Sequence, residues 1–403
     1  MKTGSLTSYR ERIETDLRQN ILPFWRQHVM DREHRTFFGS LTNDLVLDRG
    51  VTRGALLTTR ILWTYAAAYR RYRDAASLEM ADFAYADLLA RFLDRAHGGL
   101  FWSINADGTP ERTRKQVYGQ AFGIYALTEY HLATGKREPL DHAVALFRLL
   151  EQHGRDRRLG GYWEAFARDW SPIEDVRLSP VDMNTPKSQN TLLHVMEAYT
   201  NLLRAWPDAG LRAALAALLD VMATHVVNPA THHLGLFFDN AWKAESDRIS
   251  YGHDIEASWL FWEAVTVLAD PAVAARFQPL VLKIAEVTLA EGVDADGGVY
   301  NEGGPSGLTN TNKEWWPQAE AVVGFLNAYQ ISGDMRFLDA SLRTWDFIEQ
   351  RLIDRRSGEW FRGVTRDGAL LADELKVSFW KCPYHNGRAG LQAVARLQAL
   401  GAR

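Results

Sequence analysis

Glycine and aromatic residues occur together six times along the chain, at near-regular intervals. The six stretches are TFFGSL (36–41), HGGLFWSINADG (97–108), LGGYWEAFARDW (159–170), HLGLFFDNAW (233–242), DGGVYNEGG (296–304) and SGEWFRGVTRDG (357–368). One glycine from each stretch (Gly39, Gly98, Gly160, Gly235, Gly297 and Gly358) marks gaps of 59, 62, 75, 62 and 61 residues. Such self-similarity indicates one supersecondary unit repeated six times, and each stretch is typical of a small β-hairpin or turn.

Between these stretches the sequence predicts pairs of helices. A mostly apolar segment follows each stretch, at 55–70, 115–133, 188–203, 250–264, 314–330 and 385–400. A more amphipathic segment precedes each stretch, as at 86–96 and 279–292. Apolar helices belong inside a fold and amphipathic helices outside. We therefore predict an all-α fold, an (α/α)6 barrel of six inner and six outer helices with short β-hairpins at one mouth. An open α-solenoid is the alternative, and either would be a single domain over 1–403.

Bulk composition excludes several classes of protein. The net charge of −4 gives no electrostatic reason to expect a nucleic-acid partner. The single cysteine, Cys382, excludes a disulfide within the chain and favours a reducing compartment. The polar N-terminus does not resemble a signal peptide. The sequence has no run of about 18 uncharged apolar residues, so we expect no membrane partner. We expect a cytoplasmic protein, monomeric or weakly homodimeric.

Polar and aromatic side chains gather where the apolar helices begin. In chain order they are Arg60, Tyr118, Gln120, Asn190, His194, His253, Glu256, Trp315, Trp316, Glu320, Trp380, Tyr384 and His385. If the inner helices run parallel, these groups converge at one mouth of the barrel. Six helix N-termini would supply a positive potential there, which favours an anionic intermediate and keeps imidazoles neutral. Flat aromatic rings beside polar groups are also suited to holding sugars.

Three histidines at equivalent repeat positions indicate acid–base chemistry. A neutral imidazole at pH 7 is a competent general base. Glu256 lies three residues after His253, on the same helix face, and is expected to orient that ring. The sequence contains no HExxH motif of the kind that would predict a metal site. GGPSG (303–307) lacks the Lys-Ser/Thr of a phosphate-binding loop. We therefore predict no metal.

Four blocks resemble the cellobiose 2-epimerases of the N-acylglucosamine 2-epimerase superfamily. They are KSQNTLLHVMEAYTNLLRAWPD (187–208), SYGHDIEASWL (250–260), EWWPQAEAVVGFLNAYQ (314–330) and WKCPYHNGRA (380–389). The resemblance implies an (α/α)6 barrel and cofactor-free epimerisation at C2 of a reducing-end sugar. The sugar ring opens, a base removes the C2 proton, and a cis-enediolate is reprotonated on its other face.

The resemblance also implies roles for individual residues. His253 and His385 match the acid/base pair, His194 the histidine that assists ring opening, and Arg60 the cation near O1 and O2. Glu256 would orient His253. The expected substrate-binding residues are Tyr118, Asn190, Trp315, Trp316, Glu320 and Trp380, with Trp380 as a stacking platform. Gln189 and Leu192 depart from the family pattern, where Met and His are expected, and this leaves open a disaccharide or a monosaccharide substrate.

Other functions remain open on the sequence alone. A glycoside hydrolase on the same barrel needs two carboxylates, for which Glu256 and Glu320 are candidates, but it leaves three histidines unexplained. A mannose 2-epimerase or a mannose–fructose isomerase would use the same histidines on a monosaccharide. A non-catalytic sugar- or protein-binding barrel would have no turnover at all.

Overall fold

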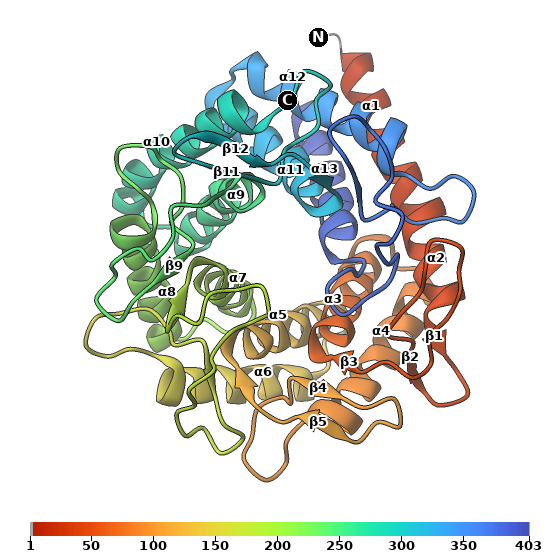
Figure 1. The fold of residues 1–403 in the computed structure, drawn as a ribbon, viewed down its shortest axis with the longest axis vertical. Coiled ribbons are helices and arrows are strands. Elements are labelled where there is room, and N and C mark those ends of the chain that lie inside the picture. Colours follow the sequence, from red (N-terminus) through yellow and green to blue (C-terminus); the bar gives the residue numbers. More distant parts are fainter. Residues whose placement is uncertain (1–2, 403) are drawn as a thin grey trace.

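Six inner helices form a closed ring in the computed structural model, which describes residues 3–402. They are α3 (Ala55–Tyr72), α5 (Val117–Thr134), α7 (Gln189–Ala205), α9 (Tyr251–Leu268), α11 (Trp315–Ser332) and α13 (Tyr384–Gly401). Each packs on the next, and α13 returns to contact α3 (Figure 1). Closure confirms the predicted (α/α)6 barrel and excludes the open solenoid.

An outer layer of helices surrounds this ring. Its members are α1 (Thr3–Asp16) with α2 (Leu22–His28), α4 (Ala75–Asp87), α6 (Arg137–Leu149), α8 (Ala209–Val221), α10 (Pro271–Val287) and α12 (Met335–Phe347). Each contains or ends in a five-residue π-helical turn: η1 (Leu17–Ile21), η2 (Leu88–Phe92), η3 (Leu150–Gly154), η4 (Met222–Val226), η5 (Thr288–Gly292) and η6 (Ile348–Leu352). The first helix, α1, packs on the last, α13, and so completes the sixth pair.

Local chemistry explains where the outer helices begin. Aspartates precede four of them, and the side chains of Asp74, Asp208, Asp270 and Asp334 accept hydrogen bonds from first-turn backbone N–H groups. Such N-caps satisfy donors that have no partner within the helix. The inner helices are apolar on nearly all sides because they contact two inner neighbours and an outer helix.

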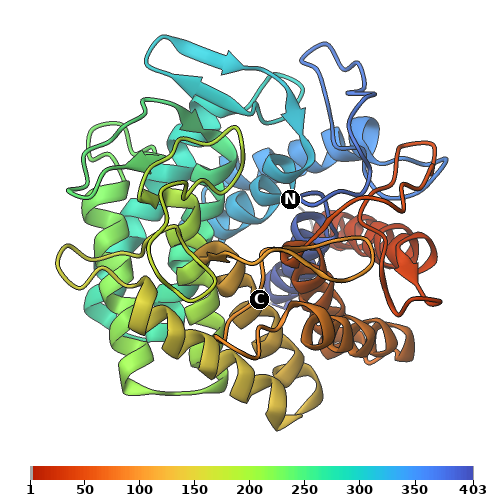
Figure 2. The ribbon, with the colours of Figure 1, turned by 60° about the horizontal axis from the view of Figure 1, so that its bottom comes forward.

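Short antiparallel strands gather at one mouth of the barrel (Figure 2). The sheets are β1 (Met30–Asp31) with β2 (Thr36–Phe37); β3 (Arg53–Gly54), β4 (Ser103–Ile104) and β5 (Pro110–Arg112); β6 (Lys115–Gln116) with β7 (Ala165–Phe166); β8 (Lys187–Ser188) with β9 (Phe237–Phe238); β10 (Ile249–Ser250), β11 (Glu302–Gly304) and β12 (Gly307–Asn310); and β13 (Lys313–Glu314) with β14 (Gly363–Val364). Five strands lead directly into an inner helix and pair with a strand from the next repeat, as Lys115 does with Phe166. The inner helices therefore begin at this mouth, and the sheets join neighbouring repeats.

One helical run has the length and composition of a membrane span among the residues described. It is Ala209–Val226, formed by α8 and η4. This run is the outer helix of the third pair, contacts α7 and α9, and buries Leu211, Leu215 and Leu218. An apolar face of this kind is what an outer helix of the barrel requires.

Candidate active site

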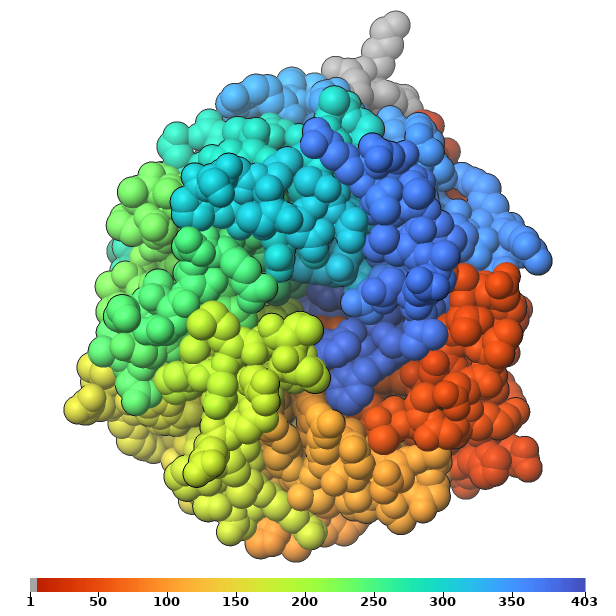
Figure 3. Space-filling view, in the orientation of Figure 1, coloured from red at the N-terminus to blue at the C-terminus, as the bar shows by residue number. Residues whose placement is uncertain are grey.

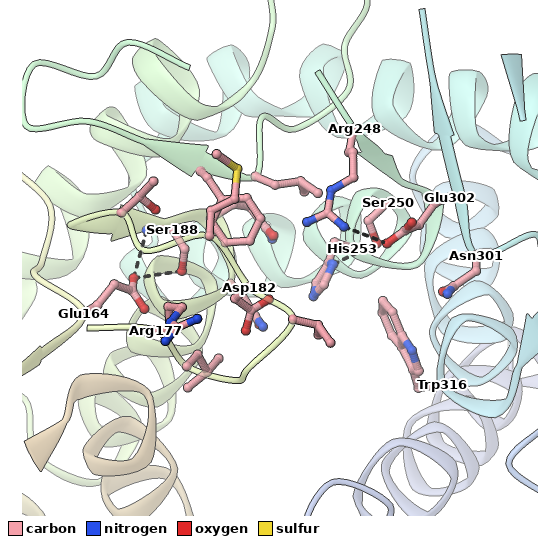
Figure 4. Close-up of a pocket in the computed structure, with 18 of the residues that line it drawn as sticks. Glu164, Arg177, Asp182, Ser188, Arg248, Ser250, His253, Asn301, Glu302 and Trp316 are labelled. Atoms are coloured by element: carbon pink, nitrogen blue, oxygen red, sulfur yellow. Dashed lines mark hydrogen bonds and ion pairs between the residues drawn. The ribbon is translucent and has the colours of Figure 1, made fainter. Parts of the chain in front are cut away.

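A pocket opens at the centre of the strand-bearing mouth (Figure 3). Asn190, His253 and Trp316 of the predicted site line it. The long loop between β7 and β8 forms one wall, with Arg177, Leu178, Val181, Asp182 and Met183. Figure 4 shows His253 and Trp316 on the side of the pocket opposite Glu164 and Ser188. The other predicted residues are not part of the lining of this pocket.

His253 stands at the first turn of α9 and faces this pocket. Its Nδ1 lies 2.8 Å from Ser250 Oγ, and its ring centroid lies 4.7 Å from that of Trp316. Burial, together with the positive charges that His194 and His385 can carry, lowers the pKa of His253 to about 3. The imidazole is therefore neutral across the physiological range. The expected contact from Glu256 is wrong, because Ser250 is the partner of His253 and Glu256 is bonded to Arg388.

His385 stands at the first turn of α13 and approaches the same tryptophan. Its ring centroid is 5.7 Å from that of Trp316, and its Nδ1 is 2.7 Å from Glu320 Oε1. Burial, with the cations Arg60 and Arg388, lowers the pKa of His385 well below its usual value. Glu320 fixes the ring through Nδ1 and leaves Nε2 for a bound molecule. Glu320 thus orients a histidine, although not in the sugar-contacting role expected of it.

His194 is buried between two aromatic rings of α5. Its centroid lies 5.0 Å from that of Tyr118 and 4.8 Å from that of Phe122. Its Nδ1 is 2.9 Å from Glu197 Oε2. Burial alone would raise the pKa of Glu197. The positive charge of Arg388 and the hydrogen bond from His194 have the larger effect and lower this pKa to about 2. Glu197 is therefore a permanent carboxylate that orients the third histidine.

One guanidinium holds together the carboxylates beneath the site. The buried Arg388 of α13 contacts Glu197, lies 2.5 Å from Glu256 Oε1 and lies 2.7 Å from Glu320 Oε1. These carboxylates come from α7, α9 and α11. Burial disfavours the charge of Arg388, but its three acidic neighbours hold its pKa above the usual value. Burial and the Glu320 charge raise the pKa of Glu256 to about 7.

The same cluster contains a possible set of metal ligands. Donor atoms of Glu256, Glu320 and His385 lie within 4.8 Å of one another. Arg388 donates to both carboxylates, so it already supplies the positive charge that a metal would contribute. We assign the cluster to the support of His385, and the predicted lack of a metal stays a prediction.

Arg60 lies buried in a cage of aromatic rings. Its Nη2 donates to Tyr118 Oη over 2.8 Å, and its guanidinium carbon lies 4.3 Å from the Phe122 centroid and 4.9 Å from that of Tyr384. Its Nη1 donates to the Trp380 carbonyl over 3.3 Å. Arg60 therefore connects Tyr118 to the segment that leads to His385. Nearby Cys382 is buried, and burial raises the pKa of its thiol, which disfavours a nucleophilic thiolate.

The two neighbouring tryptophans of α11 have different surroundings. Trp316 lines the pocket, whereas Trp315 is 3% exposed and packs beneath Arg362 and Lys381. The structure therefore does not place Trp315 on the pocket surface expected of a sugar contact. Trp380 is partly exposed, with its ring 6.1 Å from Trp102 and 6.3 Å from Tyr118, and it stays available as a platform. Gln120 instead bonds the backbone of Leu100.

Sequence reasoning missed three residues that support the histidines: Glu197, Arg388 and Ser250. A signal existed for Glu197, which follows His194 by three residues and so shares its helix face. Arg388 follows Tyr384 by four residues, which places both on the inward face of α13. An arginine deep in an apolar helix is a further signal, because such a charge requires acidic partners.

Comparison with known proteins gives a consistent result. The family model described as N-acylglucosamine 2-epimerase matches residues 36–389. The cellobiose 2-epimerase of Bacteroides fragilis is 43% identical over 380 residues, covering 94% of this chain and 97% of that protein. The structure of cellobiose 2-epimerase from Spirochaeta thermophila superposes with a TM-score of 0.93 at 39% identity, covering 98% of each chain. A D-mannose isomerase structure has a TM-score of 0.84 at 20% identity, covers 96% of this chain and 97% of its own, and shows a shared fold alone.

Proposed function

We propose that this chain, which belongs to the N-acylglucosamine 2-epimerase family and is a sugar 2-epimerase, acts on a disaccharide such as cellobiose. Its reaction would interconvert glucose and mannose at the reducing end, and lactose or mannobiose are further candidates. The relatives named cellobiose 2-epimerase support this substrate class. The pocket supports it too, because polar groups of the β7–β8 loop, Arg177 and Asp182, extend its lining beyond His253.

The observation that carries the proposed chemistry is the pair of histidines beside Trp316. His253 from α9 and His385 from α13 approach that ring from two different helices. Both have lowered pKa values, so each is neutral at pH 7 and able to accept the C2 proton, and the histidine that delivers a proton to the other face must first take one up from a substrate hydroxyl or from water. Epimerisation at C2 needs proton removal on one face and proton delivery on the other. Two separate imidazoles suit this reaction better than one.

The remaining groups fit the steps before and after proton transfer. Ring opening needs a proton donor and acceptor at the ring oxygen and O1, a role for His194 oriented by Glu197. Removal of the C2 proton places negative charge on O1 and O2 of the enediolate. The Arg60 guanidinium and the N-termini of the inner helices supply positive potential for that charge. Tyr118, Asn190, Trp316 and Trp380 would contact the sugar.

We retain a monosaccharide 2-epimerase or isomerase as the alternative, because Gln189 of the pocket wall departs from the family pattern. A hydrolase or a non-catalytic barrel receives no support from the family assignment. The proposal also includes a cytoplasmic protein that is monomeric or weakly dimeric, with no nucleic-acid or membrane partner. The proposed reaction uses no cofactor.

Incubation with cellobiose, and separately with mannose, in D2O tests the proposal by NMR. Glucosyl-mannose carrying deuterium at C2 is the expected product. Labelled glucose from mannose, with cellobiose unchanged, would move the assignment to the monosaccharide alternative. A ketose as main product would indicate isomerisation, and free glucose from cellobiose would indicate hydrolysis; either result contradicts the proposal.

A further inference from the structure

Five of the glycine-aromatic hairpins close in the same way. In each, a backbone N–H donates to the carbonyl of a residue four or five positions later. The donor–acceptor pairs are Asp94–Gly99 at 2.9 Å, Asp156–Gly161 at 2.9 Å, Asn228–His233 at 2.9 Å, Asp294–Gly298 at 2.8 Å and Asp354–Glu359 at 2.9 Å. We call the acceptor residue the closing position of its hairpin. The five closing positions therefore share this hydrogen bond and can be compared, although only Gly99, Gly161 and Glu359 have a positive φ.

Glycine occupies three of these closing positions, and a side chain occupies the other two. Gly99 shows why glycine is used, because a Cβ there would lie 2.9 Å from the Trp170 ring. His233 and Glu359 are the exceptions among the five hairpins compared, and they are 4% and 0% exposed. Glu359 also has a φ of 63°, a left-handed conformation that residues other than glycine rarely adopt. Their side chains point into the protein and not to solvent.

His233 is tied to the first turn of α9. Its Nδ1 is 2.7 Å from Asp254 Oδ2, and Asp254 Oδ1 accepts the Leu234 N–H over 2.8 Å. Its Nε2 lies 3.2 Å from Glu291 Oε2 on η5. Asp254 is fully buried and directly follows His253. The closing residue of this hairpin therefore holds the backbone turn that carries one proposed base.

Glu359 is tied in the same way to the first turn of α13. Its Oε1 accepts from Asn386 Nδ2 over 2.6 Å and from Lys381 Nζ over 2.9 Å. Its Oε2 accepts from Trp25 Nε1 over 2.6 Å. Asn386 directly follows His385, and Lys381 lies four residues before it. The carboxylate thus fixes the segment on both sides of the other proposed base.

Two of the three hairpins that close with glycine are joined to their inner helices differently, through a helix glutamine. On α5, the amide of Gln120 bonds the backbone N and O of Leu100, over 2.7 and 2.9 Å. On α11, Gln318 bonds the N and O of Val299 in the same way, over 2.6 and 2.7 Å. A helix-to-hairpin connection therefore recurs around the barrel. On α9 and α13 it passes through a buried ionisable side chain at the closing position, and those two helices carry His253 and His385.

We propose that His233 and Glu359 are positioning residues for the two bases, His233 for His253 and Glu359 for His385. Each fixes the first turn of its helix so that the imidazole keeps its place beside Trp316. The physical reason is that a misplacement of about 1 Å in a proton-transfer group can cost about 100-fold in rate. The inference rests on the proposed two-base function. It also explains why Glu359 is kept in a strained conformation where glycine serves in other repeats.

The test replaces each closing residue by the glycine of the other repeats, as His233→Gly and Glu359→Gly. We expect kcat on cellobiose to fall about 10- to 100-fold, with KM within about threefold, since neither residue lies in the pocket lining. The matched control is Gln120→Leu, which cuts the same kind of hairpin connection on α5, a helix without a proposed base. It should lower the melting temperature and leave kcat within about twofold, and any effect through Tyr118, the proposed sugar contact of α5, should fall on KM.

A conservative variant separates positioning from simple stability. His233→Asn offers an amide N–H near the position of Nδ1, so it can keep the bond to Asp254 while losing the contact to Glu291. It should restore kcat to within about threefold of the unaltered enzyme. Where a glycine variant does not fold, His233→Leu or Glu359→Met replaces it, because each keeps much of the volume and loses the hydrogen bonding.

The outcomes distinguish this inference from the proposed function. If the glycine variants behave like Gln120→Leu, losing stability with kcat nearly unchanged, the positioning role is refuted and the epimerase stands. If His233→Asn shows no rescue, the bond to Asp254 is not what matters, and the inference fails for His253. If the unaltered protein does not exchange the C2 proton of any sugar tested, the proposed function fails first.

Discussion

Removal of the buried guanidinium, by Arg388→Met, should destabilise the barrel and abolish activity. Methionine fills much of the same volume but leaves three buried carboxylates, Glu197, Glu256 and Glu320, without their shared cation. Removing one partner of a buried ion pair costs about 3–5 kcal/mol. With an unfolding entropy of about 2.1 cal/mol/K per residue, the melting temperature of this 403-residue chain would fall by about 4–6 °C.

The pH dependence of this loss is a sharper test than its size. Without Arg388, burial and mutual repulsion raise the folded-state pKa values of the three carboxylates, including that of Glu197, which is now about 2. The folded variant then binds more protons than the unfolded chain, whose Glu pKa is about 4.3. Its stability is therefore gained as pH falls through those raised values. The deficit against the unaltered protein should be largest near pH 8 and smaller near pH 5.5.

Arg396→Met is the matched control on the same helix. Arg396 donates to the neutral side-chain oxygens of Asn327 and Gln330, over 3.0 and 2.6 Å. Its loss should cost about 1–2 kcal/mol, with little dependence on pH. Thermal unfolding followed by circular dichroism at both pH values measures the two variants. An Arg388 variant no less stable than the Arg396 variant at pH 8, or a deficit that grows as pH falls, would refute the reasoning.

Three further predictions concern the site itself. Trp316→Ala should reduce kcat/KM more than tenfold with little loss of stability, whereas Trp315→Ala should cost about 3–5 kcal/mol of stability. Equal effects of the two variants on kcat/KM and on stability would contradict the different roles assigned to the two tryptophans. In a plot of kcat/KM against pH, the loss of activity on the acid side should lie below pH 5, because the pKa of His253 is lowered to about 3 and that of His385 is also lowered. A loss centred near pH 6.5 would argue against both histidines as the bases. Cys382→Ala should keep activity within about threefold, since burial raises the thiol pKa and favours the neutral form; a loss above tenfold would show a chemical role.

Much of the architecture was readable from the sequence because it repeats. Six glycine-aromatic stretches located the hairpins, and the alternation of apolar and amphipathic segments gave the inner and outer helices. The π-helical turns, such as η2 (Leu88–Phe92), could not be predicted in this way. Each spans only five residues, which is too short for hydrophobic periodicity to distinguish it from the α-helix that it adjoins.

The sequence predicted which residues form the site but not which of them contact one another. Repeat position brought His194, His253 and His385 to one mouth, because inner helices that start at the same mouth place their first two turns together. The pairing of Glu256 with His253 failed because i, i+3 spacing places two groups on one face but does not choose between competing partners. Arg388, from another helix, competes more strongly for Glu256 because it carries a full positive charge.

Deuterium exchange by single-histidine variants tests the central claim, that two histidines act on opposite faces of C2. His253→Asn and His385→Asn would each be incubated in D2O with the glucose-type and the mannose-type disaccharide separately, and C2 deuteration of the recovered sugar followed by NMR. With two bases, each variant loses epimerisation but still exchanges one epimer, and the two variants exchange opposite epimers. If one variant exchanges both epimers while the other exchanges neither, a single base does the chemistry and the account is wrong.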